Sequence, residues 1–319
     1  MKKNILLLET VSEEADQLLH EGAQIFMADS PSSGPAIAEM HPIHAIITRG
    51  KGDVSPELIS GCPDLEVIAR CGVGLDNVHV DFATTSGVKV VNAPGSNADT
   101  VAEHTLALML SLQRQMYRSI AAVKDNNWGF RTVYAGDEIR GKTLGILGLG
   151  DIGSKVARLA TAFGMQVIYS GQKEKPGVDY DFCSLEELLQ RADIISLHLP
   201  LTNATRHLLD TAAIAKMQPH GLIINTSRGA VIDETALLKA LMQGTIGGFA
   251  ADVLTVEPPS AGHPFLELDN VLITPHSASL TARTYNEMCV LTVRNTLALL
   301  EGKSIDDKYI FNSAALNGK

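Results

Sequence analysis

Short apolar runs alternate along the chain with longer stretches in which apolar residues recur at helical spacing. Continuous short runs of this kind are typical of strands that are buried on both faces. In the first hundred residues they predict strands at Ile5–Leu8, Ala45–Thr48, Leu65–Ala69 and Val88–Val91, a helix at Ser55–Ser60 and a loop at Ser30–Pro35. This alternation predicts a parallel sheet that is covered by helices on both faces.

The pattern changes at Asp99. Residues Thr100–Met116 predict one long apolar helix that Asp99 or Thr100 would cap. After Gly141 a second alternating series begins, with strands expected at Thr143–Leu147, Gln166–Ser170, Asp193–His198, Leu222–Thr226, Gly247–Val253 and Val271–Thr274. A last helix at about Ala282–Glu301 would lead into a polar tail. Six parallel strands with intervening helices match a dinucleotide-binding domain in number and spacing.

Length, charge and cysteine usage narrow the class of protein. The 319 residues suggest about two domains. The 26 basic and 36 acidic residues give a formal net charge of −10, which argues against a nucleic acid as partner. No apolar stretch is long enough for a membrane span or a signal peptide, so no membrane partner is expected. The four cysteines form no CxxC pair and predict neither a disulfide framework nor a metal site. We therefore expect a cytoplasmic protein.

A glycine-rich loop follows the strand expected at Thr143–Leu147. Gly148, Gly150 and Gly153 satisfy the pattern G-x-G-x-x-G, and a helical stretch follows. In such a loop the first glycine permits a tight turn, the second lets a pyrophosphate approach the backbone, and the third lets the helix pack on the strand. The helix N-terminus would offer free N–H groups to the pyrophosphate. The flanking strand and helix favour dinucleotide binding over an ordinary glycine-rich turn.

The end of the next strand bears on the choice of cofactor. NAD-binding loops of this type have an acidic residue about 20 positions later, which holds the ribose 2′-OH. Here that strand ends in Ser170, Gly171, Gln172 and Lys173, without a carboxylate. Ser170, Gln172 and Lys173 could donate to a 2′-phosphate. An exposed polar turn is an equally good interpretation, so the residues favour NADP only slightly and leave use of both cofactors open.

Three residues that could carry chemistry each follow a predicted strand. Arg228 follows Leu222–Ile224, Glu257 comes after Ala251–Val253, and His276 comes after Val271–Thr274. Because ligands bind at the carboxyl ends of parallel strands, these side chains could share one site.

The chemistry would be divided among the three residues. His276 would act as general acid or base, and Glu257 would hydrogen-bond the imidazole, orient it and favour its protonated form. Arg228 would bind a substrate carboxylate and polarise the adjacent carbonyl. Taken singly, each also has a structural explanation, as a buried histidine, a loop carboxylate or a solvated charge. Their succession behind a cofactor loop favours the catalytic interpretation.

Several sequence blocks together resemble the D-isomer-specific 2-hydroxyacid dehydrogenase family. They run from about residue 45 to 300 and comprise Gly72–Asn77, Asn92–Gly95, Val101–Glu103, Gly148–Gly153, His198–Thr202, Asn225–Gly229, Asp252–Val253, Glu257–Pro258 and Pro275–Ala278. Among its members, the chain resembles most a 3-phosphoglycerate dehydrogenase without a regulatory domain. The clear departure is Gly171, where members that use NAD have Asp.

The resemblance implies a fold and a partner. A Rossmann-type doubly wound parallel sheet (98–287) would be inserted in a second, flavodoxin-like α/β domain (1–97 and 288–319). The active site would lie in the cleft between the two domains. A homodimer would form through the cofactor domain, and the helix at Thr100–Met116 is the candidate interface, although core packing would explain most of its face equally well.

The motifs and the resemblance also assign contacts. The expected cofactor contacts are Val73, Thr100, Gly148, Gly150, Asp151, Ile152, Gly153, Ser170, Gly171, Gln172, Lys173, Leu199, Pro200, Thr205, Thr226, Ser227, Arg228, Asp252, His276, Ser277 and Ala278. The expected substrate contacts are Arg49, Lys51, Gly72, Val73, Gly74, Arg228 and His276.

The nature of the substrate depends on Arg49 and Lys51, which resemble the cationic loop of 3-phosphoglycerate dehydrogenases. They suit a 2-oxoacid with a second anionic group, although both could simply be solvated. Glyoxylate and hydroxypyruvate reductases are the main competitors, and an NADP preference would favour them. Some relatives of the family are corepressors that bind NAD(H) without turnover. The intact set of Arg228, Glu257 and His276 argues for an enzyme instead.

Overall fold

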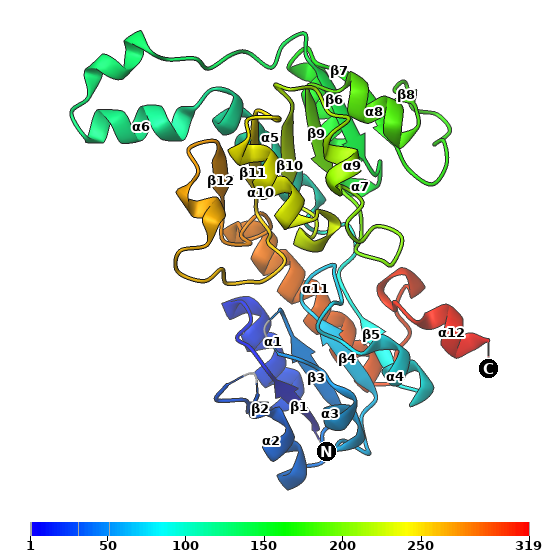
Figure 1. Cartoon of the computed structure of the whole chain (residues 1–319). Coiled ribbons are helices and arrows are strands. Elements are labelled where there is room, and N and C mark those ends of the chain that lie inside the picture. Colours follow the sequence, from blue (N-terminus) through cyan, green and yellow to red (C-terminus); the bar gives the residue numbers. More distant parts are fainter. Residues whose placement is uncertain (1, 31, 51, 319) are drawn as a thin grey trace. The chain divides into compact units, whose positions relative to one another are not determined.

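A computed structural model describes residues 2–30, 32–50 and 52–318. The chain divides into two compact units (Figure 1). Unit 1 contains the residues up to Asn97 and those from Leu280 onward, and unit 2 comprises Ala98–Ser279. The predicted boundary at residue 288 falls inside a helix, whereas the division at Leu280 comes before that helix begins.

Unit 1 contains a parallel five-stranded sheet in the order β2-β1-β3-β4-β5. The strands are β1 (Lys3–Leu7), β2 (Ala23–Met27), β3 (Ala45–Thr48), β4 (Val67–Arg70) and β5 (Lys89–Val91). The helices are α1 (Glu13–Gly22), α2 (Gly34–Met40), α3 (Pro56–Ser60), α4 (Val80–Thr85), α11 (Ala282–Leu300) and α12 (Ser313–Asn317). This strand order is that of flavodoxin-like domains. It confirms the predicted fold class for this unit.

The first apolar run forms a strand that is buried on both faces. Ile5 and Leu7 pack in the core beneath α1 and α11, and Leu6 and Leu8 pack in the core on the opposite face. Figure 1 shows α1 and α11 side by side on one face of this sheet. Because successive strand residues point to opposite faces, a continuous apolar run satisfies both layers at once.

Three sequence expectations for unit 1 are wrong in detail. The edge strand β2 was not expected, because only one of its five residues, Ala23, is fully buried. The expected loop at Ser30–Pro35 gives way to a helix at Gly34, with Pro35 in the first turn. The expected polar tail is folded: Ile310 forms an antiparallel bridge with Val91, and a short 3-10 turn, η4 (Asp307–Tyr309), precedes it.

Unit 2 contains a parallel seven-stranded sheet in the order β12-β11-β10-β9-β6-β7-β8. The strands are β6 (Thr143–Leu147), β7 (Gln166–Ser170), β8 (Asp181–Phe182), β9 (Ile194–Leu197), β10 (Leu222–Asn225), β11 (Gly248–Ala251) and β12 (Val271–Ile273). The order reverses between β6 and β9, as in a Rossmann-type sheet. The predicted class is therefore confirmed. The seventh strand, β8, consists of two exposed residues and is too short for a pattern of apolar residues to predict it.

Helices cover both faces of this sheet. The helices of unit 2 are α5 (Ala98–Gln113), α6 (Met116–Lys124), α7 (Asp151–Ala162), α8 (Leu185–Arg191), α9 (Thr211–Ile214) and α10 (Glu234–Met242). The 3-10 turns of this unit are η1 (Trp128–Thr132), η2 (Gly229–Val231) and η3 (Pro264–Glu267). One core contains buried residues of α5 and α7, and the other contains buried residues of α8, α9 and α10. None of the described helices is long and apolar enough to cross a bilayer.

The helix expected at Thr100–Met116 is divided in two. Helix α5 begins at Ala98, so Asp99 and Thr100 lie inside its first turn and do not cap it. It ends at Gln113, and Gln115 adopts a left-handed conformation (φ 46°) before α6 begins at Met116. Glutamine gives no sequence signal for such a turn, which glycine usually forms.

Candidate active site

The glycine loop lies where the strand order of unit 2 reverses. Gly148 follows β6 with φ of 94°, and its N–H donates to the carbonyl of Ser170 at 2.9 Å. A Cβ on Gly148 would lie 2.6 Å from the carbonyl oxygen of His198, which follows β9. A Cβ on Gly153 would lie 2.1 Å from the carbonyl oxygen of Gly148. Both glycines are therefore required by close backbone packing.

The start of α7 is open toward the loop. Gly150 precedes the helix in an extended conformation, and a Cβ there would meet no atom within 4 Å. Asp151 is exposed, whereas Ile152 packs against the core. The N–H groups of this first helical turn have no partner inside a helix. The residues of this cradle suit a dinucleotide pyrophosphate, because no protein atom lies within 4 Å of the open side of Gly150.

The segment after β7 carries the cofactor-selecting candidates. Ser170 is buried as the last residue of the strand, and the exposed Gly171, Gln172 and Lys173 follow it. Sequence reasoning missed Lys175, whose Nζ donates to the carbonyl of Leu149 inside the glycine loop at 2.9 Å. A second cation shortly after β7 was the only signal that could have identified it.

The predicted catalytic imidazole and carboxylate are in contact. His276 Nδ1 lies 2.6 Å from Glu257 Oε2, and Glu257 Oε1 accepts the N–H of Leu254 at 2.8 Å. Each carboxylate oxygen therefore has a partner. Since Nδ1 faces the carboxylate, it carries a proton and Nε2 is left to exchange one with a substrate.

The pair shifts both pKa values in opposite directions. The hydrogen bond to Glu257 is the largest influence on the pKa of His276 and raises it, and the charge of Asp252 acts in the same direction. Burial is the largest influence on the pKa of Glu257 and would raise it, but the hydrogen bonds from His276 and Leu254 and the charge of Arg228 outweigh burial. The pKa of Glu257 is therefore lowered. The geometry favours a charged imidazolium–carboxylate pair near neutral pH.

Arg228 lies at the same end of the sheet. It follows β10 and its Nη1 donates to the carbonyl of Ser227 at 2.7 Å. Its charge influences the pKa of both Glu257 and His276. The next residue, Gly229, packs against the backbone of the loop that carries Glu257, since a Cβ there would lie 2.1 Å from the carbonyl carbon of Leu254. The structure thus brings the three predicted catalytic residues together within unit 2.

A buried carboxylate holds the segment that carries His276. Asp252 is 2% exposed, and its carboxylate accepts the N–H groups of Ser277 (2.9 Å) and Ala278 (2.8 Å) and the hydroxyl of Thr274 (2.6 Å). The backbone carbonyl of Asp252 accepts the N–H of His276. His276 has a backbone φ of 52°, in the left-handed region. That conformation is strained for a residue other than glycine, so these bonds hold the imidazole in place. Asp252 stays a predicted cofactor contact, and its side chain has this structural role in addition.

The other predicted cofactor contacts of unit 2 are spread over several loops. Leu199 lies beside the glycine loop, since a Cβ on Gly148 would lie 2.8 Å from its side chain. Thr205 donates its hydroxyl to the carbonyl of Pro200 at 2.6 Å. Ser227 is buried and donates to Asn225.

The two predicted threonine contacts involve α5. The Thr226 hydroxyl lies 2.9 Å from that of Thr105 on this helix, and Thr100 lies partly buried in its first turn.

In unit 1, the predicted substrate cation is held by other protein groups. Arg49 follows β3, and its Nε lies 3.7 Å from Glu9, while its guanidinium stacks on Tyr285 at 5.3 Å. Glu9 also accepts the N–H of Arg49 and of Gly50. Lys51 lies outside the described residues. Arg49 is therefore the counter-ion of a buried carboxylate, and its side chain is 31% exposed.

The predicted backbone contacts of unit 1 lie after β4. Gly72 has φ of 154° and covers the side chain of Arg70, so a Cβ there would collide with the guanidinium. Its carbonyl accepts the N–H of Ala93 at 2.8 Å. The carbonyl of Val73 accepts the Asn92 amide at 2.7 Å, and Gly74 is partly buried beside it.

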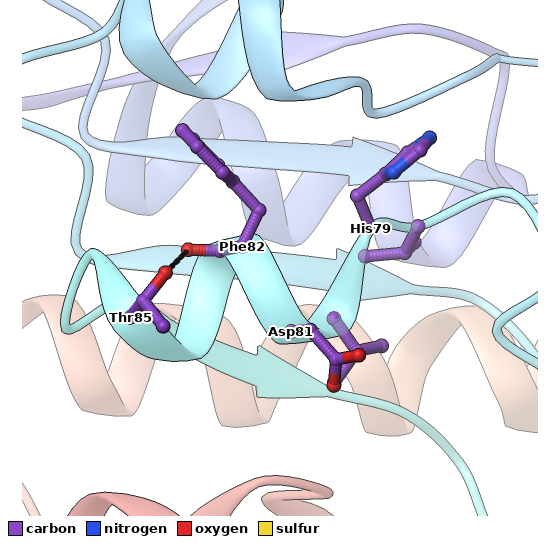
Figure 2. A pocket seen from close by; sticks show the side chains of 6 residues that line it. His79, Asp81, Phe82 and Thr85 are labelled. Atoms are coloured by element: carbon purple, nitrogen blue, oxygen red, sulfur yellow. Dashed lines mark hydrogen bonds between the residues drawn. The ribbon is translucent and has the colours of Figure 1, made fainter.

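A surface hollow of about 600 Å³ lies over α4 in unit 1 and is lined by Val78–Phe82 and Thr85 (Figure 2). Figure 2 shows the Thr85 hydroxyl donating to the carbonyl of Phe82. None of the predicted site residues lines this hollow. It contributes nothing to the chemistry described above.

Sequence and structure comparisons decide the family. A sequence profile described as "D-isomer specific 2-hydroxyacid dehydrogenase, NAD binding domain" matches residues 106–278. A glyoxylate reductase of Aeropyrum pernix is 36% identical over 315 residues, which cover 95% of this chain and 94% of that protein. The chain belongs to the D-isomer-specific 2-hydroxyacid dehydrogenase family.

Two further relatives indicate the range of this dehydrogenase family. A D-3-phosphoglycerate dehydrogenase of Mycobacterium tuberculosis is 35% identical over 98% of this chain, which spans 60% of that protein. The structure of an NADPH-dependent glyoxylate/hydroxypyruvate reductase of Sinorhizobium meliloti, in complex with NADP and malonate, has a TM-score of 0.87, is 28% identical and covers 94% of each chain. Membership confirms the predicted class of enzyme, an NAD(P)-dependent D-2-hydroxyacid dehydrogenase.

Replacing Glu257 by glutamine should move the pH dependence of this dehydrogenase. We expect reduction of a 2-oxoacid to require protonated His276, and its rate should then fall as the pH rises through the pKa of His276. The carboxylate raises that pKa, and its removal should shift the alkaline limb of kcat/KM to lower pH. Steady-state reduction rates from about pH 5 to 9 measure this shift.

Glu234→Gln is the matched control for this substitution, because Glu234 accepts the N–H of Thr255 in the same loop at 2.7 Å without touching His276. Its alkaline limb should stay in place. An equal shift in both variants would show that the loop, and not the charge of Glu257, sets the profile.

Proposed function

We propose that this dehydrogenase reduces a short 2-oxoacid of the glyoxylate and hydroxypyruvate class, with NADPH as the preferred cofactor. The observation that carries the proposed reduction is the contact between His276 and Glu257, which follow strands of the same parallel sheet as Arg228 and the glycine loop. The relatives named above act on glyoxylate, hydroxypyruvate or 3-phosphoglycerate. The cofactor preference rests on the absence of a carboxylate from residues 170–173 and on the cation Lys173. Glu174 follows it, and Lys175 Nζ already donates to the carbonyl of Leu149.

The proposed mechanism divides the work among the residues of unit 2. Arg228 binds the substrate carboxylate and polarises the adjacent carbonyl. His276 delivers a proton from Nε2 to the carbonyl oxygen, while Glu257 stabilises the imidazolium that donates it. A bound reduced nicotinamide supplies the hydride. In the reverse direction the same imidazole accepts the hydroxyl proton.

The backbone of Gly72, Val73 and Gly74 is the proposed substrate contact in unit 1. The N–H of Gly72 already donates to the carbonyl of Arg70 at 2.8 Å, so the amides of Val73 and Gly74 are the ones that suit a carboxylate. The pairing of Arg49 indicates how many anionic groups the substrate has. Glu9 already neutralises the charge of Arg49, so this cation does not call for a second anion on the substrate. A 2-oxoacid without a second anion is therefore the first candidate. A phosphorylated substrate is the second, because Arg49 keeps donors that a phosphate could share with Glu9.

A substrate and cofactor panel tests the proposed activity. We expect kcat/KM with NADPH to be highest for glyoxylate or hydroxypyruvate, and phosphohydroxypyruvate and pyruvate to be poorer substrates. The comparison with NADH measures the cofactor preference. A clear preference for phosphohydroxypyruvate would replace the first candidate by the second, and a preference for NADH would contradict the assignment of residues 170–175.

We also propose a homodimer that forms through unit 2. Helix α5, the expected interface, packs mostly in the core. The following helix α6 has no buried residue, and Met116, Ile120 and Val123 on it are about half exposed. Trp128 is 71% exposed in the adjoining η1, and Figure 1 shows both elements projecting from the rest of unit 2. A second copy of this chain is the proposed occupant of this face, and the mass in solution by light scattering tests it.

A further inference from the structure

His104 on α5 contacts the carboxyl end of β12, and no sequence motif assigned it a role. Its Nε2 lies 3.0 Å from Thr274 Oγ1 and 3.6 Å from Asp252 Oδ1. The same Thr274 hydroxyl lies 2.6 Å from Asp252 Oδ1. An imidazole, a hydroxyl and a buried carboxylate thus form a connected group beneath the segment that carries His276.

The distances fix the direction of these hydrogen bonds. A hydroxyl has one proton, and at 2.6 Å from a carboxylate oxygen Thr274 donates that proton to Asp252. Toward His104 the hydroxyl oxygen can only accept. His104 therefore carries a proton on Nε2, and the chain of donors runs from His104 through Thr274 to Asp252.

Asp252 connects this chain to the catalytic segment. Its carboxylate accepts the N–H groups of Ser277 and Ala278, and its carbonyl accepts the N–H of His276. These bonds hold His276 in its left-handed conformation. The direction in which the carboxylate points therefore decides where the imidazole lies, and a misplacement of about 1 Å can cost a hundredfold in rate.

We infer that His104 is a positioning residue for proton transfer at His276, and that it acts by orienting the Asp252 carboxylate through the hydroxyl of Thr274. His104 itself contacts neither reacting group. The inference rests on the proposed role of His276 as the proton donor.

The electrostatics give this role a specific signature. The charged groups that face His276 are Glu257, Asp252 and Arg228, and the imidazole of His104 faces Asp252. Without the donor on His104, the negative charge of Asp252 is less compensated and acts more strongly on His276. The pKa of His276 should then rise further, so the alkaline limb of reduction moves to higher pH while kcat falls.

Three His104 variants of the full chain test the inference, with NADPH and glyoxylate as the reactants. His104→Phe keeps a ring without a donor, and His104→Asn keeps an amide that is too short. In both, kcat should fall roughly ten- to a hundredfold, and the limb should move upward. His104→Gln keeps an N–H donor at similar reach and should restore most of kcat and the original limb.

His220→Phe is the control. This substitution breaks a pair between His220 and Asp193, whose atoms lie 2.7 Å apart. Asp193 comes just before β9 and His220 just before β10, so the pair lies at the opposite end of the same sheet. Its kcat and pH profile should remain those of the parent enzyme.

The outcomes separate this inference from the proposed function. If His276→Gln abolishes reduction while His104→Phe and His104→Asn leave kcat and the limb unchanged, the inference is wrong and the proposed function stands. His104 would be a packing residue, and the inference wrong, if kcat fell while the alkaline limb of the pH profile stayed at its original pH and His104→Gln restored no activity. If His276→Gln leaves the rate unchanged, the proposed mechanism itself fails.

Discussion

Replacing His276 by glutamine should lower kcat for 2-oxoacid reduction roughly 10²–10⁴-fold, the usual contribution of a general acid. Glutamine fills similar space and can still hydrogen-bond Glu257, but it cannot release a proton near neutral pH. Binding of NADPH should change much less than kcat: His276 is one of many expected cofactor contacts, and the glycine cradle lies on another loop. Stopped-flow reduction rates, together with a fluorescence titration of NADPH, measure the two effects separately.

His207→Gln is the matched control for this experiment. His207 also has φ of 52° and is exposed on unit 2, so its replacement makes the same chemical change in the same backbone conformation. It contacts no predicted catalytic group, and its kcat should stay within about twofold of the parent value. A comparable loss of kcat in both variants would mean that backbone disturbance, and not proton transfer, explains the effect at His276.

Sequence patterns predict this fold well where burial is complete. Strands β6, β9 and β10 read as continuous apolar runs because helices cover both faces of the sheet. The short edge strand β8 and the left-handed turn at Gln115 escape such a pattern, because neither leaves an apolar period or a glycine in the sequence.

The candidate site divides in the same way. Arg228, Glu257 and His276 could be predicted because each follows a strand, and parallel strands end at the same edge of a sheet. His104 could not be predicted, because it lies 170 residues from Thr274, and only the packing of α5 against the sheet brings the two side chains together. The structural role of Asp252 could not be predicted either, since the N–H groups that it accepts belong to the backbone, which no residue type reveals.

The glycine loop predicts different effects on the Tm of the apo protein for two alanine substitutions. In Gly153→Ala the new methyl group would lie 2.1 Å from the carbonyl oxygen of Gly148, so α7 must move away from the loop. Overpacking of this kind costs roughly 1–3 kcal/mol of unfolding free energy, and both Tm and cofactor binding should decrease. In Gly150→Ala the methyl group meets no protein atom within 4 Å, and φ of −78° suits alanine. The apo fold should therefore keep its Tm.

The same Gly150→Ala methyl group occupies the side from which a pyrophosphate approaches the backbone. We expect Kd for NADPH to rise roughly tenfold or more, which corresponds to about 1.4 kcal/mol. Melting curves with and without saturating NADPH distinguish the two variants, because NADPH should stabilise Gly150→Ala less than the parent enzyme although the apo proteins melt alike. Equal stabilisation by NADPH would place the pyrophosphate elsewhere, and an unchanged apo Tm in Gly153→Ala would contradict the backbone packing that defines this loop.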